Sequence, residues 1–239
     1  MKKNILLFGA SSDVGEKIIE ELKKEYNIYG TKYQGNIKNN LINEQKCDIR
    51  NLEDIDKVYS KTPSLDAVIF SSFPEILEDA KDFEGYLKAE ALLKGHMYAI
   101  TKAMNGQLNP NGKIINILGQ CVNHGLVGAP YMGMAFAAMH NFSKSVNAKY
   151  GRNEEFAIYD LLMGPIATKM WDRVPGQVVN DNKQKTNSFV DPAIVASYVN
   201  QILKHPIGPT EIVIDGFYSL PNKVWTKKKL QSDTKRKKP

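Results

Sequence analysis

Short apolar segments alternate with amphipathic segments along most of this chain, and this alternation limits its fold more than any other feature. The apolar segments have the length of strands, and Lys113–Leu118 (KIINIL) is rich in β-branched residues. The amphipathic segments repeat their apolar residues at helical spacing. Strands that are apolar throughout and alternate with helices are typical of a parallel sheet covered on both faces. The sequence therefore predicts an α/β fold, a Rossmann-like doubly wound parallel sheet in a three-layer αβα arrangement.

The expected elements follow from this pattern. The expected strands are Asn4–Phe8, Tyr26–Thr31, Leu65–Phe70, Lys113–Leu118, Phe156–Met163 and Glu211–Asp215, and the expected helices are Val14–Lys24, Tyr86–Met104, Pro130–Lys149 and Pro192–Lys204. Asp191 and Pro192 give the last helix a cap and a first residue. The polar, weakly periodic segment Lys169–Val190 is expected to be a loop or lid over a small-molecule ligand.

The charge of the chain is concentrated at its C-terminal end. The net charge is +6, but residues 223–239 hold eight basic residues and one acidic residue, which leaves residues 1–222 at −1. We therefore expect one domain over 1–222 and a basic tail over 223–239. The tail is either a solvated, disordered end or a contact for nucleic acid or another acidic partner. The rest of the chain gives no reason to expect nucleic-acid binding.

The sequence also favours a cytoplasmic protein. No segment approaches the roughly 18–20 apolar residues that span a bilayer. The first apolar run ends at Phe8 with no small-residue cleavage site after it, so we interpret it as a strand and not as a signal peptide. Cys47 and Cys121 lie far apart and fit no metal or redox spacing, which suits a reducing compartment. We expect no metal site and no membrane segment.

A glycine-containing turn between the first strand and the first helix is the best candidate for a binding site. At this position backbone N–H groups and the helix dipole can hold a pyrophosphate. Glycine permits the tight turn and a close approach of the helix, and Ser12 or Asp13 can cap that helix. The alternative is a small polar turn without a ligand. The candidate residues are Gly9, Ser11, Ser12, Asp13, Val14 and Gly15.

Several motifs in this order resemble those of the short-chain dehydrogenase/reductase family. The turn resembles the family's TGxxxGxG, with Asp13 in place of the middle glycine. Over about 1–220 the other matching segments are Cys47–Arg50, Leu65–Ile69, Phe142–Ser145, Met163–Thr168 and Ile214–Gly216. The resemblance implies the family's fold and a nicotinamide cofactor, NADP or NAD.

The resemblance also assigns cofactor contacts. Asp48, followed by Ile49, would lie at the adenine, and Ser71 stands within the segment that replaces the family's Asn-Asn-Ala-Gly. Thr168 would contact the carboxamide of the nicotinamide. No acid follows the second strand to bind the ribose hydroxyls, and Lys32 could meet a 2′-phosphate, which favours NADP over NAD. A solvated lysine is the alternative for Lys32.

The family's active-site residues are missing from the corresponding positions. The asparagine, serine, tyrosine and lysine positions become Leu92, Gly119, Met132 and Phe136. No lysine occurs from 114 to 143, so no shift of register restores a Tyr-x-x-x-Lys pair. Methionine and phenylalanine cannot donate a proton. Either the protein is a divergent oxidoreductase acting on a small molecule without the usual mechanism, or it is a catalytically silent cofactor-binding scaffold or regulator.

Other polar residues leave the catalytic residues open. Cys121, Asn123, His124 and Tyr131 lie between a strand and a helix, where they are either alternative acid–base groups or incidental loop residues. His96 and His140 fall inside helices and are expected to be packing or surface residues. The helix Pro130–Lys149 packs against a second subunit in relatives, which favours a homo-oligomer.

Overall fold

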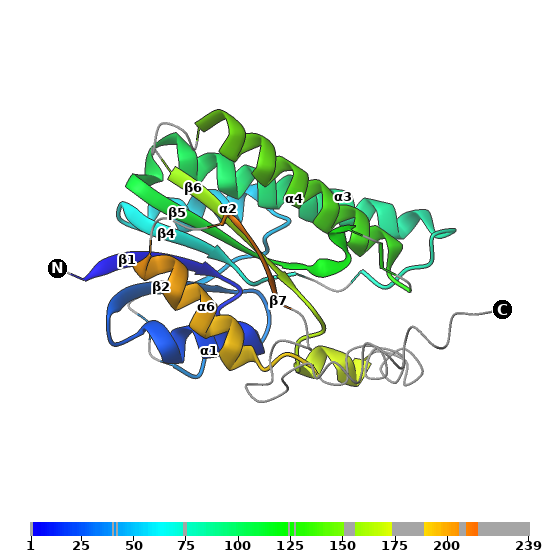
Figure 1. Ribbon diagram of the computed structural model, residues 1–239, viewed down its shortest axis with the longest axis horizontal. Helices are drawn as coiled ribbons and strands as arrows, with labels where there is room; N and C mark the ends of the chain where they lie inside the picture. Colours follow the sequence, from blue (N-terminus) through cyan, green and yellow to red (C-terminus); the bar gives the residue numbers. More distant parts are fainter. Residues whose placement is uncertain are drawn as a thin grey trace, which may run out of the picture.

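A computed structural model describes residues 2–39, 41, 43–73, 76–123, 125–126, 128–150, 156–173, 189–205 and 209–214. These residues form a seven-stranded parallel sheet in the order β3-β2-β1-β4-β5-β6-β7 (Figure 1). The strands are β1 (Lys3–Phe8), β2 (Tyr26–Lys32), β3 (Asn43–Lys46), β4 (Leu65–Phe70), β5 (Leu108–Gly119), β6 (Phe156–Met163) and β7 (Glu211–Ile214). The α-helices are α1 (Asp13–Leu22), α2 (Leu52–Ser60), α3 (Phe83–Lys102), α4 (Pro130–Tyr150) and α6 (Pro192–Lys204). The predicted doubly wound α/β fold is confirmed.

The helices cover both faces of the sheet and create two separate cores. Figure 1 shows α1 and α6 side by side on one face, with α3 and α4 together on the other. Apolar residues of α1 and α6 join one buried cluster with Ile5, Leu7 and Ile69, whereas α2, α3 and α4 join the other with Leu6 and Phe70. Neighbouring residues of β1 thus point to opposite faces, as the two-residue period of a strand requires.

Two elements near the site were not expected from the sequence. β3 has the sequence NEQK and pairs only with β2 among the described residues, so it is an edge strand that needs no apolar pattern. α2 follows it and is capped by Asn51, whose side chain accepts from the Glu53 N–H. The chain then crosses to β4 on the other side of β1, so the strand order changes direction between β1 and β4.

The remaining structural expectations concern boundaries and segments. β5 begins at Leu108, ahead of the predicted Lys113, because Leu108 pairs with Leu65 before a register shift. Among the described residues, no helix combines the length and apolar character needed to cross a membrane. Asp215, the basic tail 223–239 and most of the expected lid, 174–188, lie outside the described residues.

Helix α3 lies so close to the loop after β3 that Gly95 has no room for a side chain. A Cβ at Gly95 would overlap the carbonyl oxygen of Ile49. We expect Gly95→Ala to lower the free energy of unfolding by about 1–3 kcal/mol, because the overlap involves backbone on both sides. Urea unfolding measures the change. Gly133→Ala in α4 is the matched control, since its Cβ would lie 3.2 Å from Leu126 and helix propensity favours alanine; equal losses in both variants would contradict the prediction.

Candidate functional site

The turn between β1 and α1 is built as the sequence predicts, and its two glycines are required by close approaches. Gly9 has φ +82°, and a Cβ there would lie 2.6 Å from the Ser72 Cβ. A Cβ at Gly15 would overlap the Gly9 carbonyl oxygen, so only glycine lets α1 begin this close to the turn. Ser12 is the N-cap of α1, and its Oγ accepts from the Gly15 N–H at 2.9 Å. We call residues 9–15 the phosphate loop.

Side chains from β2 and β4 hold the phosphate loop in place. Ser71, at the end of β4, donates through Oγ to the carbonyl oxygens of Phe8 and Gly9 at 3.1 and 3.2 Å. The Gly9 N–H donates to the Thr31 Oγ1 at 3.2 Å, and the Ser11 Oγ donates to the Gln34 carbonyl at 3.0 Å. Val14 is buried in the core beneath α1. Ser71 and Val14 therefore hold the phosphate loop against the core.

Asp48, predicted to lie at the adenine, forms an ion pair with Arg50. Asp48 accepts hydrogen bonds from Arg50, from Nε at 2.9 Å and from the second guanidinium nitrogen at 2.7 Å. Burial alone would raise the pKa of Asp48, but the hydrogen bonds and charge of Arg50 outweigh it and lower that pKa. Arg50 also lies over the Tyr33 ring, 5.5 Å from its centroid. Ile49 is buried beside them.

Lys32, predicted to meet a 2′-phosphate, forms an ion pair with Glu44. Glu44 belongs to β3, whose register pairs it with Gly30 of β2. The sequence analysis missed Glu44 because β3 was not predicted. An acid next to Lys32 therefore comes from the neighbouring strand and not from the end of β2, where the family would place it.

A cluster of rings lies at the positions where the resemblance places the family's active-site residues. Phe136 meets Phe73 edge-on with centroids 5.0 Å apart, and a Cβ at Gly119 would lie 3.1 Å from the Phe136 ring. Phe73 stacks on His96 at 5.5 Å. Leu92 and Met132, at the other two altered positions, are buried in the same core. We call Phe73, His96 and Phe136 the ring cluster.

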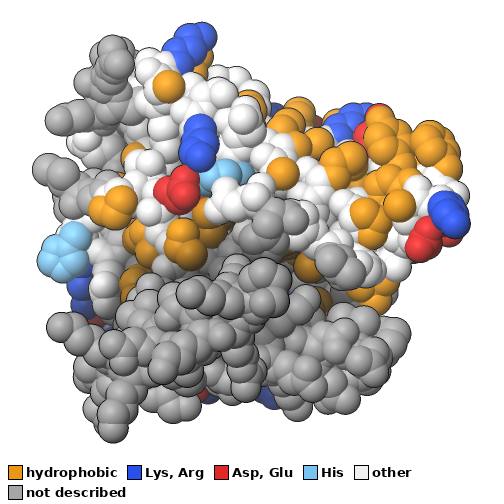
Figure 2. All heavy atoms as spheres, turned by 45° about the vertical axis from the view of Figure 1, so that its right-hand side comes forward, with side chains coloured by type: hydrophobic (Ala, Val, Ile, Leu, Met, Phe, Trp, Pro, Cys, Tyr) orange, Lys and Arg blue, Asp and Glu red, His pale blue; other side chains and the backbone are white. Residues whose placement is uncertain are grey.

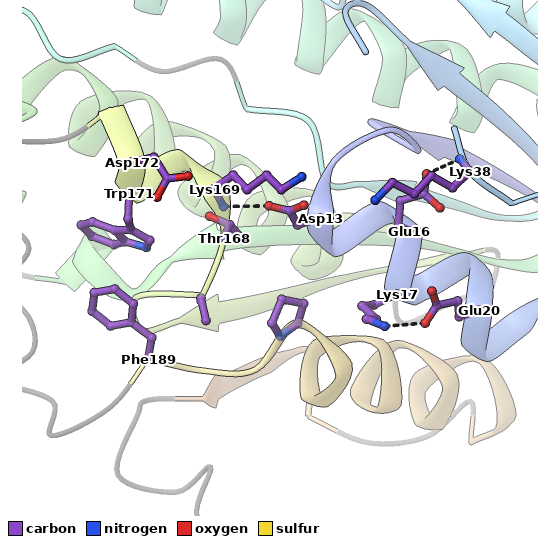
Figure 3. A pocket seen from close by; sticks show the side chains of 12 residues that line it. Asp13, Glu16, Lys17, Glu20, Lys38, Thr168, Lys169, Trp171, Asp172 and Phe189 are labelled. Carbon is purple, nitrogen blue, oxygen red and sulfur yellow. Dashed lines mark hydrogen bonds and ion pairs between the residues drawn. The ribbon is translucent and has the colours of Figure 1, made fainter. Parts of the chain in front are cut away.

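The loop after β6 contacts the phosphate loop at Asp13. A shallow hollow of about 710 Å³ lies there, with Asp13, Thr168, Lys169, Trp171 and Phe189 among its lining residues. Figure 3 shows Asp13 pointing toward Lys169, and its Oδ2 accepts from the Lys169 N–H at 2.8 Å. Thr168 thus lines the hollow beside the phosphate loop, and its predicted contact with the nicotinamide carboxamide stays a prediction.

Comparison with solved structures identifies the fold. The described arrangement resembles a short-chain dehydrogenase family protein from Francisella tularensis with a TM-score of 0.79 at 17% identity, covering 91% of this chain and 99% of that one. A short-chain dehydrogenase from Burkholderia cenocepacia in complex with NADP gives 0.68 at 16% identity, with 89% and 88% covered. BdcA in complex with NADPH gives 0.74 at 16%, with 91% and 94% covered.

The chain has the short-chain dehydrogenase/reductase fold. No family model matches the sequence, and no curated protein matches it significantly. The likeness therefore lies in the sheet order and the helix packing, which survive at sequence identities where motifs no longer decide the family.

The alternative acid–base residues that the structure describes are Cys121, Asn123 and Tyr131. Burial raises the pKa of the Cys121 thiol to about 11, so it is not an activated nucleophile. The Tyr131 hydroxyl donates to the Ala80 carbonyl at 2.9 Å, and Asn123 is exposed. His124 lies outside the described residues. In the part of the chain that the structure describes, no group of three His, Cys, Asp or Glu residues is arranged to hold a metal ion.

A buried polar network begins at His96 of the ring cluster. The sequence analysis missed it. The His96 Nε2 lies 3.0 Å from the Asn116 Oδ1, and the Asn116 Nδ2 donates to Asp160 at 2.8 Å. Asp160 also accepts from the Ser143 hydroxyl at 3.0 Å and pairs with the His140 Nδ1 at 2.7 Å. His96 and His140 are buried, as expected for packing residues, but both are polar partners. The signal for this network was Asp160 itself, an acid within the otherwise uncharged strand FAIYDLLM.

Burial shifts the pKa values of His96 and Asp160. It lowers the pKa of His96 to about 4, and the hydrogen bond with Asn116 opposes the shift only in part. Burial also raises the pKa of Asp160, against hydrogen bonds from His140, Asn116 and Ser143. The neutral His96 donates from Nε2, because the Asn116 amide nitrogen already faces Asp160 and only its oxygen is left for His96.

Proposed function

We propose that this protein binds a nicotinamide adenine dinucleotide at the phosphate loop and does not use the proton relay of short-chain dehydrogenases/reductases. One observation carries the binding half of the proposal. Gly9 and Gly15 bring the start of α1 against the carboxyl end of β1, next to the point where the strand order changes direction between β1 and β4. Ligands of open α/β sheets bind at that point, with phosphates on the helix N-terminus.

The residues around the phosphate loop suit the adenosine diphosphate half of such a cofactor. Gly9, Ser11, Ser12 and Gly15 would hold the pyrophosphate, with Asp48 and Ile49 at the adenine. Lys32 would meet the 2′-phosphate of NADP once it leaves Glu44. Two of the similar structures contain NADP or NADPH. A bound nicotinamide would supply hydride transfer, and Thr168 would contact its carboxamide.

The ring cluster supports the second half of the proposal. Phe136 and Met132 are apolar, and Gly119 carries no hydroxyl, so these positions cannot donate, accept or relay a proton. His96 stays neutral and buried behind Phe73. The Tyr131 hydroxyl donates to the Ala80 carbonyl, 51 positions away in the sequence. We therefore favour a catalytically silent cofactor-binding scaffold or regulator over a divergent oxidoreductase acting on a small molecule.

Thermal shift with NADP, NAD and ADP tests the binding. At a hundredfold excess over Kd a ligand adds about 2.7 kcal/mol, which raises Tm by roughly 5–10 °C for a domain of this size. Lys32→Ala is expected to weaken stabilisation by NADP and to leave that by NAD unchanged. NADPH consumption with a panel of carbonyl compounds is expected to show no turnover. Turnover would favour the divergent oxidoreductase, and no stabilisation by any nucleotide would refute the proposed function.

The partners and the cellular location also belong to this proposal. Figure 2 shows hydrophobic side chains gathered over part of the surface, and the exposed apolar residues near the starts of α3 and α4 include Leu77, Phe83, Leu87 and Met134. Such a surface supports a homo-oligomer that uses α3 and α4. The basic tail as a contact for acidic partners and a cytoplasmic location rest on the sequence alone.

A further inference from the structure

Asp13 stands where the starts of two helices meet. It is the first residue of α1, and its Oδ2 accepts from the Lys169 N–H at 2.8 Å. Lys169 is in turn the first residue of a short 3₁₀ helix, Lys169–Arg173. The two residues are 156 positions apart in the sequence, so this hydrogen bond ties the phosphate loop to the loop after β6 (Figure 3).

The loop on the far side of this bond is fixed by its own contacts. Ile166 forms a parallel bridge with Val190, and the Trp171 Nε1 donates to the Ile166 carbonyl at 2.7 Å. Trp171 also packs against Phe189 with ring centroids 4.7 Å apart. Asp13 therefore does not follow a mobile partner. Its carboxylate meets an N–H that the rest of the loop holds in position.

The start of α1 favours a bound anion. The first N–H groups of a helix lack partners within the helix and carry partial positive charge, so they attract phosphates and carboxylates alike. Here the carboxylate of the chain itself supplies the negative charge. A phosphate held at the same helix start would be repelled by that carboxylate.

We propose that Asp13 is a built-in anion that limits the affinity of the phosphate loop for phosphate-bearing ligands. The inference rests on the proposed function, and it adds the residue that sets how tightly the site takes a pyrophosphate. Ligand binding then requires the Asp13 carboxylate to leave the Lys169 N–H, so the hydrogen bond between α1 and the loop after β6 is present in the free protein and is broken when a nucleotide enters.

Calorimetric titration of the full chain with adenosine, ADP and NADP tests the inference. Asp13→Asn keeps an oxygen for the Lys169 N–H and removes the charge, while Asp13→Gly removes both. We expect both variants to bind ADP and NADP about tenfold more tightly than the original chain, because a like charge is removed from the phosphate site. Adenosine has no phosphate, so its affinity is expected to stay within twofold.

Glu16→Gln is the matched charge control. Glu16 also lies in the first turn of α1, but its carboxylate accepts from the Lys38 N–H at 2.5 Å and the Asn39 Nδ2 at 2.7 Å, and Figure 3 shows it turned toward Lys38. Its replacement removes the same charge without touching Lys169. An effect on ADP affinity as large as that of Asp13→Asn would overturn the specific role of Asp13.

Hydrogen exchange of the Lys169 amide tests its hydrogen bond with Asp13 without any ligand. Asp13→Gly is expected to speed this exchange at least tenfold, and unchanged exchange would refute the hydrogen bond on which the inference rests. If the original chain binds NADP and Asp13→Gly binds it no more tightly, this inference fails while the proposed function stands. If the original chain and both variants all fail to bind any nucleotide, the proposed function fails as well.

Discussion

Replacing Asp160 with alanine is expected to lower the free energy of unfolding by about 3–5 kcal/mol, because several buried hydrogen-bond donors lose an acceptor at about 1–3 kcal/mol each. Asp160 is 2% exposed and accepts from Asn116, Ser143 and His140. Without its carboxylate the three donors stay buried, and Asn116 and Ser143 keep only their longer hydrogen bonds, to the Ser143 hydroxyl at 3.2 Å and the Met139 carbonyl at 3.1 Å. Because a typical domain is stable by only 5–15 kcal/mol, the loss would leave the fold marginal. Urea unfolding near pH 7, followed by circular dichroism, measures it.

Two control variants distinguish the effect of losing the network from the effect of losing a carboxylate in a strand. Asp66→Ala removes an acid from β4 that accepts from the Asn4 N–H and the Asn109 Nδ2, yet Asp66 is only partly buried, so we expect a loss of about 1 kcal/mol. Asp160→Asn retains the volume and one acceptor oxygen, and we expect an intermediate loss. A loss below about 1 kcal/mol in Asp160→Ala would show that the network does not stabilise the fold.

The interior of the fold was predictable from the sequence, and its polar edge was not. β1, β4, β5 and β6 are buried on both faces, so their apolar runs identify them. β3 is a polar edge strand that takes its place by pairing with β2. Periodicity cannot reveal a strand of this kind, because its side chains alternate with no buried face.

The same limit applies to the site. Gly9 and Gly15 are needed by a local turn, and local spacing was enough to find them. Lys32 meets Glu44 only through the register of β2 and β3, and Asp13 meets Lys169 across 156 positions. Such contacts depend on how the sheet is ordered, which a single sequence does not specify. The residues that a turn requires could therefore be predicted, while the partners that determine their charge could not.

Acidification is expected to destabilise the protein through His96. Burial lowers the pKa of His96 in the folded state to about 4, while in the unfolded chain it is near 6.5. Between these values the unfolded chain binds the proton and the folded one does not. The neutral, buried His96 therefore has no cost in stability above about pH 6.5. As the pH falls from 6.5 toward 4, the free energy of unfolding decreases. From pH 7 to 4.5 this amounts to about 2–3 kcal/mol.

His96→Phe isolates this contribution from the other groups that titrate in the same range. Phenylalanine keeps a ring against Phe70 and Phe73 but carries no proton, and it leaves the Asn116 Oδ1 without its donor. The variant is therefore expected to be less stable than the original chain at pH 7, and the difference should shrink by about 2–3 kcal/mol at pH 4.5. Urea unfolding of both proteins from pH 7 to 4.5 gives the comparison. A difference that stays constant with pH would mean that the folded protein protonates His96 as readily as the unfolded chain does, and that the ring cluster admits a charge.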